Sequence, residues 1–279
     1  MSDAAQQPTI GAGTRPVVLF GHPVGHSRSP YLHNPVFARA GLDLVYLACD
    51  VPPHRLPDAV AGLRGLNAAG ANVTIPHKQA IVPLLDDLSD EARALGAVNS
   101  ITNDDGRLTG HNTDVGGFLD GLAEYAQRLR GGEMLVWGAG GAASAVVYAL
   151  LTLQPSRLTL AARRPEQTQA LARAMAAHDS DGAIHLAASA DVDAIARSAD
   201  LLVNTTPLGM TGALADLTPW PLAAFRSGQV AYDLVYTPEQ TRFLQDAAAR
   251  GAKTVGGMPM LRGQAARAFR LWTGVDAAY

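Results

Sequence analysis

Two glycines and a small residue follow a short apolar run near the middle of the chain, with a spacing that suits phosphate binding. Met134–Trp137 is the run, and Gly138, Gly140 and Ala143 then match G-x-G-x-x-[G/A] at the start of an apolar helical stretch. The glycines allow a tight turn and a close approach of a pyrophosphate to the backbone, and the small third residue lets the helix pack on the strand. The sequence thus predicts a dinucleotide site, and the alternative is a tight turn that binds nothing.

A second group of polar residues lies just beyond predicted strands in the first half of the chain. Ser27 and Ser29 follow the apolar run Val17–Phe20, while Thr74 and Lys78 follow the run that begins at Gly70. In parallel sheets, ligands bind beyond the carboxyl ends of the strands, so these side chains can converge on one site. Short hydroxyls suit a carboxylate, and a lysine can transfer a proton. The plainer alternatives are turn and helix-cap serines, an ordinary strand threonine and a solvated lysine.

Two further kinds of residue could carry chemistry. Asp114 opens a predicted helix after His111, either as a reactive carboxylate or as an ordinary first-turn acid. Four of the five histidines in the first 80 residues are candidate metal ligands, but their spacing fits no helical or finger-type zinc pattern, so we expect no metal. They are His22, His26, His33 and His77.

Composition limits the class of protein. The 279 residues suggest two domains, and 48% hydrophobic content is typical of globular chains. A net charge of −3 gives no sign of a nucleic-acid or membrane partner. Cys49 is the only cysteine, which excludes an intrachain disulfide and fits a cytoplasmic location. The polar segment Met1–Gly13 lacks the pattern of a signal peptide, so we expect a flexible tail.

The elements that must position these residues alternate between strand and helix, which predicts α/β architecture. An Asp-Gly pair at residues 105–106 predicts a hairpin in the first half. We expect a helix from Ser29 to about Ala40, one from Asp114 to about Arg130 and one over Glu239–Gly251. After Gly138 the repeated strand–helix units predict a doubly wound nucleotide-binding domain.

Eight short motifs occur in series along the chain. In the first half they are G-H-P-V-G-H-S-R-S-P-Y-L-H-N (Gly21–Asn34), G-A-N-V-T-I-P-H-K (Gly70–Lys78), G-A-V-N-S (Gly96–Ser100) and G-H-N-T-D-V-G-G (Gly110–Gly117). In the second half they are G-A-G-G-A (Gly138–Ala142), N-T-T-P-L-G-M (Asn204–Met210), D-L-V-Y-T-P (Asp233–Pro238) and G-G-M-P-M-L-R-G-Q-A (Gly256–Ala265). Each motif alone is weak, but the eight in series are specific, and together they resemble the shikimate dehydrogenase family.

The resemblance implies an NADP-dependent oxidoreductase that interconverts 3-dehydroshikimate and shikimate for aromatic amino acid biosynthesis. It implies a substrate domain (residues 14–114 and 258–279) with a mostly parallel sheet, a Rossmann NADP domain (residues 115–257), and a C-terminal helix that returns to the first domain. The implied partner is a small-molecule substrate, and the chain would be a monomer or homodimer. The implied catalytic pair is Lys78 and Asp114. The implied substrate-binding residues are Ser27, Ser29, Thr74, Asn99, Asp114, Tyr236 and Gln264. The implied cofactor-binding residues are Asp90, Gly138, Ala139, Gly140, Gly141, Ala142, Arg163, Arg164 and Gly257.

The chain departs from the family pattern at two places. Ser100 stands where the family usually has threonine, and Ala162-Arg163-Arg164 stands where it usually has Asn-Arg-Thr. No acid follows the second strand of the nucleotide domain before Glu166, and two guanidiniums there suit a 2′-phosphate, so we expect NADP rather than NAD. The alternatives are a quinate/shikimate dehydrogenase that uses NAD or NADP, and a non-catalytic nicotinamide sensor.

Overall fold

A computed structural model describes residues 9–25, 27–188 and 190–279. His26 and most of the expected tail Met1–Gly13 therefore lie outside the described residues. The chain forms two compact units, of which the first is Met1–Thr113 with Gln264–Tyr279 and the second is Asp114–Gly263. Asp114 and the start of the last helix thus group with the second unit, and the end of that helix returns to the first.

The first unit contains a six-stranded sheet in the order β2-β1-β3-β5-β6-β4. Its strands are β1 (Arg15–Gly21), β2 (Leu44–Asp50), β3 (Gly70–Val73), β4 (Asp87–Leu88), β5 (Ser100–Asp104) and β6 (Arg107–His111). Its helices are α1 (Ser29–Arg39), α2 (Leu56–Gly65), α3 (His77–Ala80), α4 (Asp90–Leu95) and the end of α11 (Met258–Thr273), with short 3-10 turns at Pro53–Arg55 and Val82–Leu84. β2, β1 and β3 are parallel, and β5 and β6 form the predicted antiparallel hairpin.

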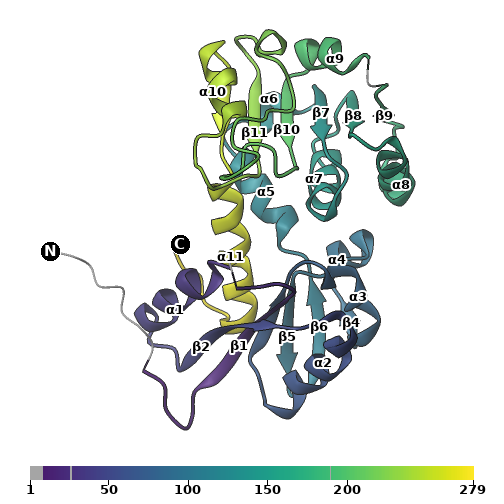
Figure 1. The fold of residues 1–279 in the computed structure, drawn as a ribbon. Helices are drawn as coiled ribbons and strands as arrows, with labels where there is room; N and C mark the ends of the chain where they lie inside the picture. Colours follow the sequence, from purple (N-terminus) through teal and green to yellow (C-terminus); the bar gives the residue numbers. More distant parts are fainter. Residues whose placement is uncertain (1–8, 26, 189) are drawn as a thin grey trace, which may run out of the picture. The chain divides into compact units, whose positions relative to one another are not determined.

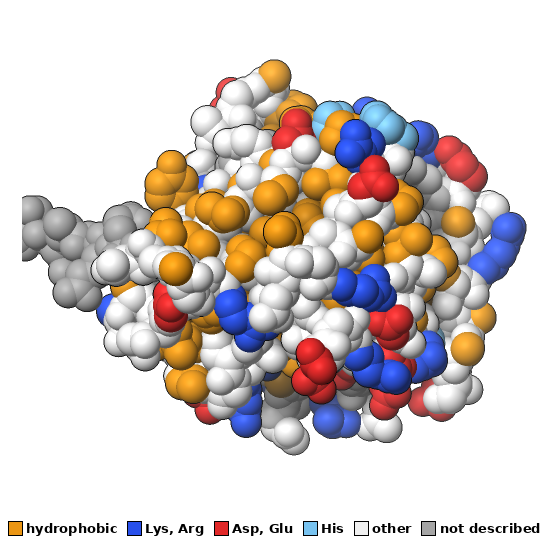
Figure 2. Space-filling view, turned by 90° about the horizontal axis from the view of Figure 1, so that it is seen from below, with side chains coloured by type: hydrophobic (Ala, Val, Ile, Leu, Met, Phe, Trp, Pro, Cys, Tyr) orange, Lys and Arg blue, Asp and Glu red, His pale blue; other side chains and the backbone are white. Residues whose placement is uncertain are grey.

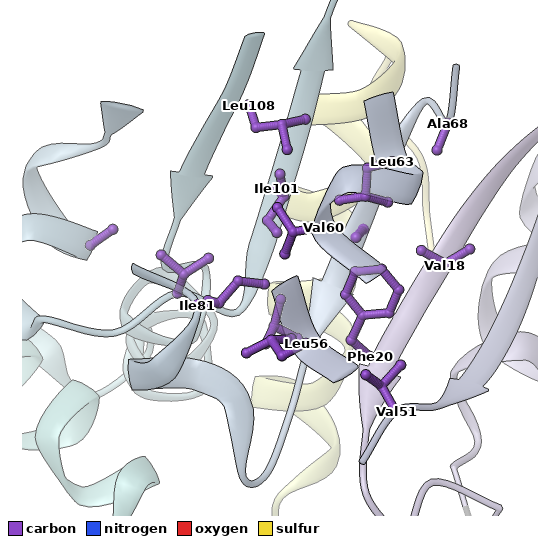
Figure 3. Packing of buried hydrophobic residues seen from close by; sticks show 14 residues of the cluster. Val18, Phe20, Val51, Leu56, Val60, Leu63, Ala68, Ile81, Ile101 and Leu108 are labelled. Carbon is purple, nitrogen blue, oxygen red and sulfur yellow. The ribbon is translucent and has the colours of Figure 1, made fainter. Parts of the chain in front are cut away.

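Alternate residues of β1 pack on opposite faces of this sheet, as the two-residue period of a strand requires. Val18 and Phe20 meet the apolar side of α2 in a cluster that Figure 3 shows from close by. Val17 and Leu19 belong to a second cluster with residues of α1 and α11. Both faces of β1 are therefore covered by apolar side chains. The polar residues that follow β1 in the sequence lie beyond its carboxyl end.

The second unit is a six-stranded parallel sheet in the order β12-β11-β10-β7-β8-β9 (Figure 1). This is the doubly wound order of dinucleotide-binding domains, as predicted. Its strands are β7 (Glu133–Trp137), β8 (Arg157–Ala161), β9 (Ile184–Leu186), β10 (Leu201–Asn204), β11 (Val230–Asp233) and β12 (Lys253–Val255). Its helices are α5 (Asp114–Leu122), α6 (Ala126–Leu129), α7 (Gly141–Leu151), α8 (Pro165–Met175), α9 (Val192–Ser198), α10 (Arg242–Ala249) and the start of α11, with 3-10 turns at Ala176–His178 and Leu222–Ala224.

Three local predictions were wrong. The helix expected from Asp114 to Arg130 is two helices, α5 and α6. The helix expected from Glu239 begins at Arg242, because the Thr241 side chain caps it by accepting a hydrogen bond from the Leu244 amide. Ser29 is the first residue of α1 and does not cap it, because the N-cap position is Arg28, whose side chain forms no capping hydrogen bond.

Figure 2 shows one face of the surface. Apolar side chains gather near its centre, and basic and acidic side chains lie interspersed around them. No helix among the described residues combines the length and apolar character needed to cross a bilayer.

Candidate active site

The serine loop after β1 brings Ser27 and Ser29 together. The Ser29 amide donates to Ser27 Oγ at 3.2 Å, and both residues are half-buried. Pro30 follows in the first turn of α1, where its missing N–H costs nothing. The hydrogen bond from the Ser29 amide holds the Ser27 hydroxyl at the start of an eleven-residue helix whose first residue carries a second hydroxyl, an arrangement that suits a carboxylate.

Thr74 and Lys78 follow β3 at the same edge of the sheet. The Thr74 amide donates to the Phe20 carbonyl at 2.8 Å, which ties the segment to the end of β1. Lys78 lies on the short helix α3, where a loop was expected, and its carbonyl accepts a hydrogen bond from the Val98 amide at 2.8 Å. This bond places the lysine backbone beside the segment that carries Asn99.

Asn99 is buried and its side chain is oriented by Thr113. The Asn99 amide Nδ2 donates to Thr113 Oγ1 at 3.0 Å, and Asn99 Oδ1 accepts from the Thr113 amide at 2.8 Å. Thr113 directly precedes Asp114, so this pair also fixes the backbone that leads into the aspartate.

Sequence reasoning missed a buried polar network beneath these residues. The Tyr46 hydroxyl donates to Asn72 Oδ1 at 2.7 Å. Asn72 Nδ2 in turn donates to the Asn99 carbonyl at 3.0 Å and to Ser100 Oγ at 2.9 Å. Burial raises the pKa of Tyr46, and the nearby Ser29 hydroxyl opposes this rise. Asn72 could have been suspected because it lies two residues before Thr74 on the same strand face, but nothing in the sequence marks Tyr46.

The remaining predicted site residues lie in separate parts of the fold. Asp90 is exposed at the start of α4, where Ser89 caps the helix. Asp114 is buried and opens α5, and Gln264 is half-buried on α11. Tyr236 is half-buried in the loop after β11. Gly257 lies against this loop, and a Cβ there would collide with the Leu234 carbonyl, so packing alone requires this glycine.

The glycine turn after β7 has the shape of a phosphate cradle. Gly138 has a φ of +111°, and a Cβ there would collide with Thr205 on the loop after β10. Gly140 and Gly141 differ, because a Cβ at either position would meet nothing within 4 Å. Ala143 is fully buried between helix and strand. The fold thus explains Gly138 and Ala143, while the open space at Gly140 and Gly141 before α7 fits a pyrophosphate.

Arg163 and Arg164 lie at the same sheet edge as this turn. They follow β8, which pairs with β7, and the Gly138 amide donates to the Ala161 carbonyl at 2.8 Å. Both are exposed, and within the described part of the chain neither forms an ion pair. The residues present therefore fit a dinucleotide with a 2′-phosphate.

A buried aspartate organises the neighbouring loops of this edge. Asp233 is fully buried and accepts hydrogen bonds from Asn204 Nδ2 at 2.9 Å, the Val235 amide at 3.0 Å and Thr241 Oγ1 at 2.5 Å. Asn204 Oδ1 also accepts from the Thr206 amide at 3.0 Å. Burial raises the pKa of Asp233 to about 6, although these hydrogen bonds lower it. This cluster explains why the motifs at Asn204 and Asp233 occur together.

The histidines are used by the fold. His77 is buried and its Nε2 lies 2.7 Å from the Val51 carbonyl, while His22 lies beside Asp50. Among the described residues, no group of three or more His, Cys, Asp and Glu side chains could hold a metal ion.

Comparison with known proteins agrees with the sequence motifs. Residues 19–101 match the family model described as the shikimate dehydrogenase substrate binding domain. The shikimate dehydrogenase (NADP(+)) of Salinibacter ruber is 52% identical over 267 residues, which cover 95% of this chain and 94% of that protein.

Solved structures show the same fold. Shikimate 5-dehydrogenase of Thermus thermophilus, solved with NADP(H) and shikimate, has a TM-score of 0.82 and 38% identity, covering 94% of this chain and 95% of that one. Quinate dehydrogenase of Corynebacterium glutamicum, solved with NAD, has a TM-score of 0.88 and 33% identity, covering 94% of this chain and 95% of that one. The 52% identity to the Salinibacter ruber enzyme, over nearly the whole length, shows that the chain belongs to the shikimate dehydrogenase family.

Proposed function

We propose that this chain is an NADP-dependent shikimate dehydrogenase that interconverts 3-dehydroshikimate and shikimate. The observation that carries the proposal is the 52% identity, over nearly the full length, to a protein of that name. The side chains are consistent with it, since hydroxyls, amides, a lysine and a carboxylate are the groups that a carboxylated polyol would need. A role in aromatic amino acid biosynthesis follows from this activity.

The substrate is held by polar side chains of the predicted set. Ser27 and Ser29 bind the carboxylate with the two hydroxyls that the serine loop brings together. The ring hydroxyls and the carboxylate are shared among the other five binding residues, which are Thr74, Asn99, Asp114, Tyr236 and Gln264. Amide groups suit ring hydroxyls because they donate and accept at once.

Lys78 and Asp114 act on the hydroxyl that is oxidised. They take its proton from the reacting oxygen in the direction of oxidation and return it in the direction of reduction. NADP, when bound, supplies the hydride acceptor. The protein supports this by holding the phosphates at Gly138–Ala142 and the 2′-phosphate at Arg163 and Arg164. Asp90 and Gly257 are proposed to lie near the nicotinamide end.

The remaining assignments concern the setting of the enzyme. We expect a small-molecule substrate as the partner and a monomer or homodimer as the working form. The single cysteine fits a reducing compartment such as the cytoplasm.

The test is turnover of shikimate with NADP, followed by the absorbance of the reduced nicotinamide. The wild type should turn over, and Lys78→Met should lose roughly 10²- to 10⁴-fold in kcat, the usual contribution of one proton-transfer group. Gln79→Ala is the matched control, because Gln79 is the exposed neighbour of Lys78 on α3. A wild type that binds NADP without turning over shikimate would support the sensor alternative, and an unchanged kcat in Lys78→Met would remove this lysine from the mechanism.

A further inference from the structure

Tyr46 is a buried residue of β2 that the proposed reaction does not use. Its ring is 1% exposed and stacks on the His33 ring with centroids 4.6 Å apart. Its backbone is clamped by Asn34, because the Tyr46 amide donates to Asn34 Oδ1 at 2.7 Å and Asn34 Nδ2 donates to the Tyr46 carbonyl at 3.1 Å. His33 and Asn34 both lie on α1, so Tyr46 joins this helix to the sheet.

The other side of Tyr46 faces the strand that leads to Thr74. Its hydroxyl donates to Asn72 Oδ1 at 2.7 Å, and the two hydrogens of Asn72 Nδ2 go to the Asn99 carbonyl and Ser100 Oγ. Every hydrogen bond that the Asn72 amide can make through nitrogen is therefore used, and its oxygen points to Tyr46. The Asn99 carbonyl, which can only accept, fixes which way the amide faces, and the phenol holds the amide oxygen on the other side.

Packing alone does not account for a tyrosine here. Tyr232 on β11 is also fully buried, yet its hydroxyl has no hydrogen-bond partner among the described residues. The fold therefore tolerates a buried phenol without a partner, whereas the Tyr46 hydroxyl bonds to Asn72 and so connects to the segment of Asn99. The backbone and ring of Tyr46 connect it to α1.

We propose that Tyr46 is a positioning residue for the substrate, which holds the first turn of α1 and the Asn72–Asn99 segment in one fixed arrangement. Through this arrangement it orients Ser29 toward the substrate carboxylate and Asn99 toward the ring hydroxyls. The inference rests on the proposed function, since those two residues are assigned to the substrate there.

The variant Tyr46→Phe tests it, because it removes the hydroxyl and keeps the ring on His33. KM for shikimate should rise about 5- to 20-fold, the effect of losing one buried hydrogen bond, while kcat changes less than about threefold. KM for NADP should stay at the wild-type value. Tyr232→Phe is the matched control, since it removes an unpartnered buried hydroxyl and should keep wild-type kinetics. A KM for shikimate within about twofold of wild type in Tyr46→Phe would overturn the inference, as would an equal rise in KM for NADP.

Two further readouts separate positioning from a general loss of stability. The effects of Tyr46→Phe and Ser29→Ala on KM for shikimate should be less than additive, because both changes act through the Ser29 hydroxyl. The effects of Tyr46→Phe and Tyr232→Phe should be additive. Amide hydrogen exchange at Val73, whose amide donates to the Asn99 carbonyl at 2.9 Å, should be faster in Tyr46→Phe and unchanged in Tyr232→Phe. The exchange readout needs no turnover, so it judges the connection even if shikimate proves not to be the substrate. Unchanged exchange at Val73 would contradict the proposal.

Discussion

We propose that the choice of cofactor depends on Arg163 and Arg164. They are exposed at the carboxyl end of β8, beside the glycine turn. If they hold the 2′-phosphate, Arg163→Ala or Arg164→Ala should weaken NADP binding by roughly 1.5–3 kcal/mol, the range for a hydrogen bond to a charged group. NAD binding should change little, and added salt should weaken NADP selectively.

Titration calorimetry of both cofactors checks this prediction. Arg157→Ala is the control, because Arg157 is an exposed arginine at the opposite end of the same strand. Equal losses of NAD and NADP affinity in the Arg163 and Arg164 variants would show that these side chains contact some other part of the cofactor.

Asp233 should make the stability of the chain depend on pH. Its pKa is raised to about 6 by burial, so the folded chain binds the proton more tightly than the unfolded chain. The charged carboxylate therefore costs stability above pH 6, and this cost disappears as the pH falls toward the ordinary aspartate value. From about pH 6 to about pH 4 this group should add on the order of 3 kcal/mol of stability.

Chemical denaturation at several pH values, compared between wild type and Asp233→Asn, isolates this effect from other titrating groups. Asp233→Asn should be less stable throughout, since an amide N–H₂ would face donors from Thr241, Val235 or Asn204. The stability difference should widen as the pH falls. A difference independent of pH would mean that Asp233 does not titrate in this range.

Residues at strand ends could be predicted from the sequence, but the network beneath them could not. Ser27, Ser29, Thr74 and Lys78 stand out because polar groups follow apolar strands directly. Tyr46 lies inside an apolar strand and reads as core, and only the packing of β2 beside β1 and α1 reveals its partners. Buried hydrogen bonds between distant segments depend on tertiary structure, which local patterns do not contain.

At the scale of elements, replacing one glycine of α5 and one glycine of α2 by alanine should change the stability of the chain in opposite directions. Gly121 lies on α5 against Tyr232, and a Cβ there would collide with the phenol. Gly62 lies inside α2, where a Cβ would meet nothing within 4 Å. Gly121→Ala should destabilise the chain by about 1–3 kcal/mol through overpacking, whereas Gly62→Ala should stabilise it by about 0.5–1 kcal/mol.

Thermal melting of the two variants beside wild type measures both effects. Since the same change is made in two helices, a shared effect on the unfolded chain cancels between them. A Gly121→Ala variant as stable as Gly62→Ala would show that α5 moves freely away from β11.

Element types were easier to predict than element ends. The hairpin at Asp105-Gly106 is confirmed, because two consecutive residues with positive φ, 47° and 89°, suit an Asp-Gly pair. The break between α5 and α6 was missed, since the apolar spacing continues across it. The start of α10 was predicted too early. Thr241 caps this helix and also bonds to Asp233, a contact that the sequence pattern does not show.

For the whole molecule, the sequence was sufficient to predict the doubly wound fold of the second unit and a mostly parallel sheet with a hairpin in the first. A strand order of β12-β11-β10-β7-β8-β9 follows from repeated strand–helix units together with right-handed crossovers. Substrate preference is a different matter, because quinate and shikimate enzymes share this fold. We propose that it depends on a few side chains, with Ser27 and Ser29 among them.

The most direct test is kcat/KM of the wild type for shikimate and quinate, each measured with NADP and NAD. Shikimate with NADP should exceed shikimate with NAD by about tenfold or more, as one charge-assisted contact to the 2′-phosphate would provide, and it should also exceed quinate with either cofactor. Equal values with NAD and NADP, or a preference for quinate, would contradict the proposed function and favour a dual-specificity quinate/shikimate dehydrogenase.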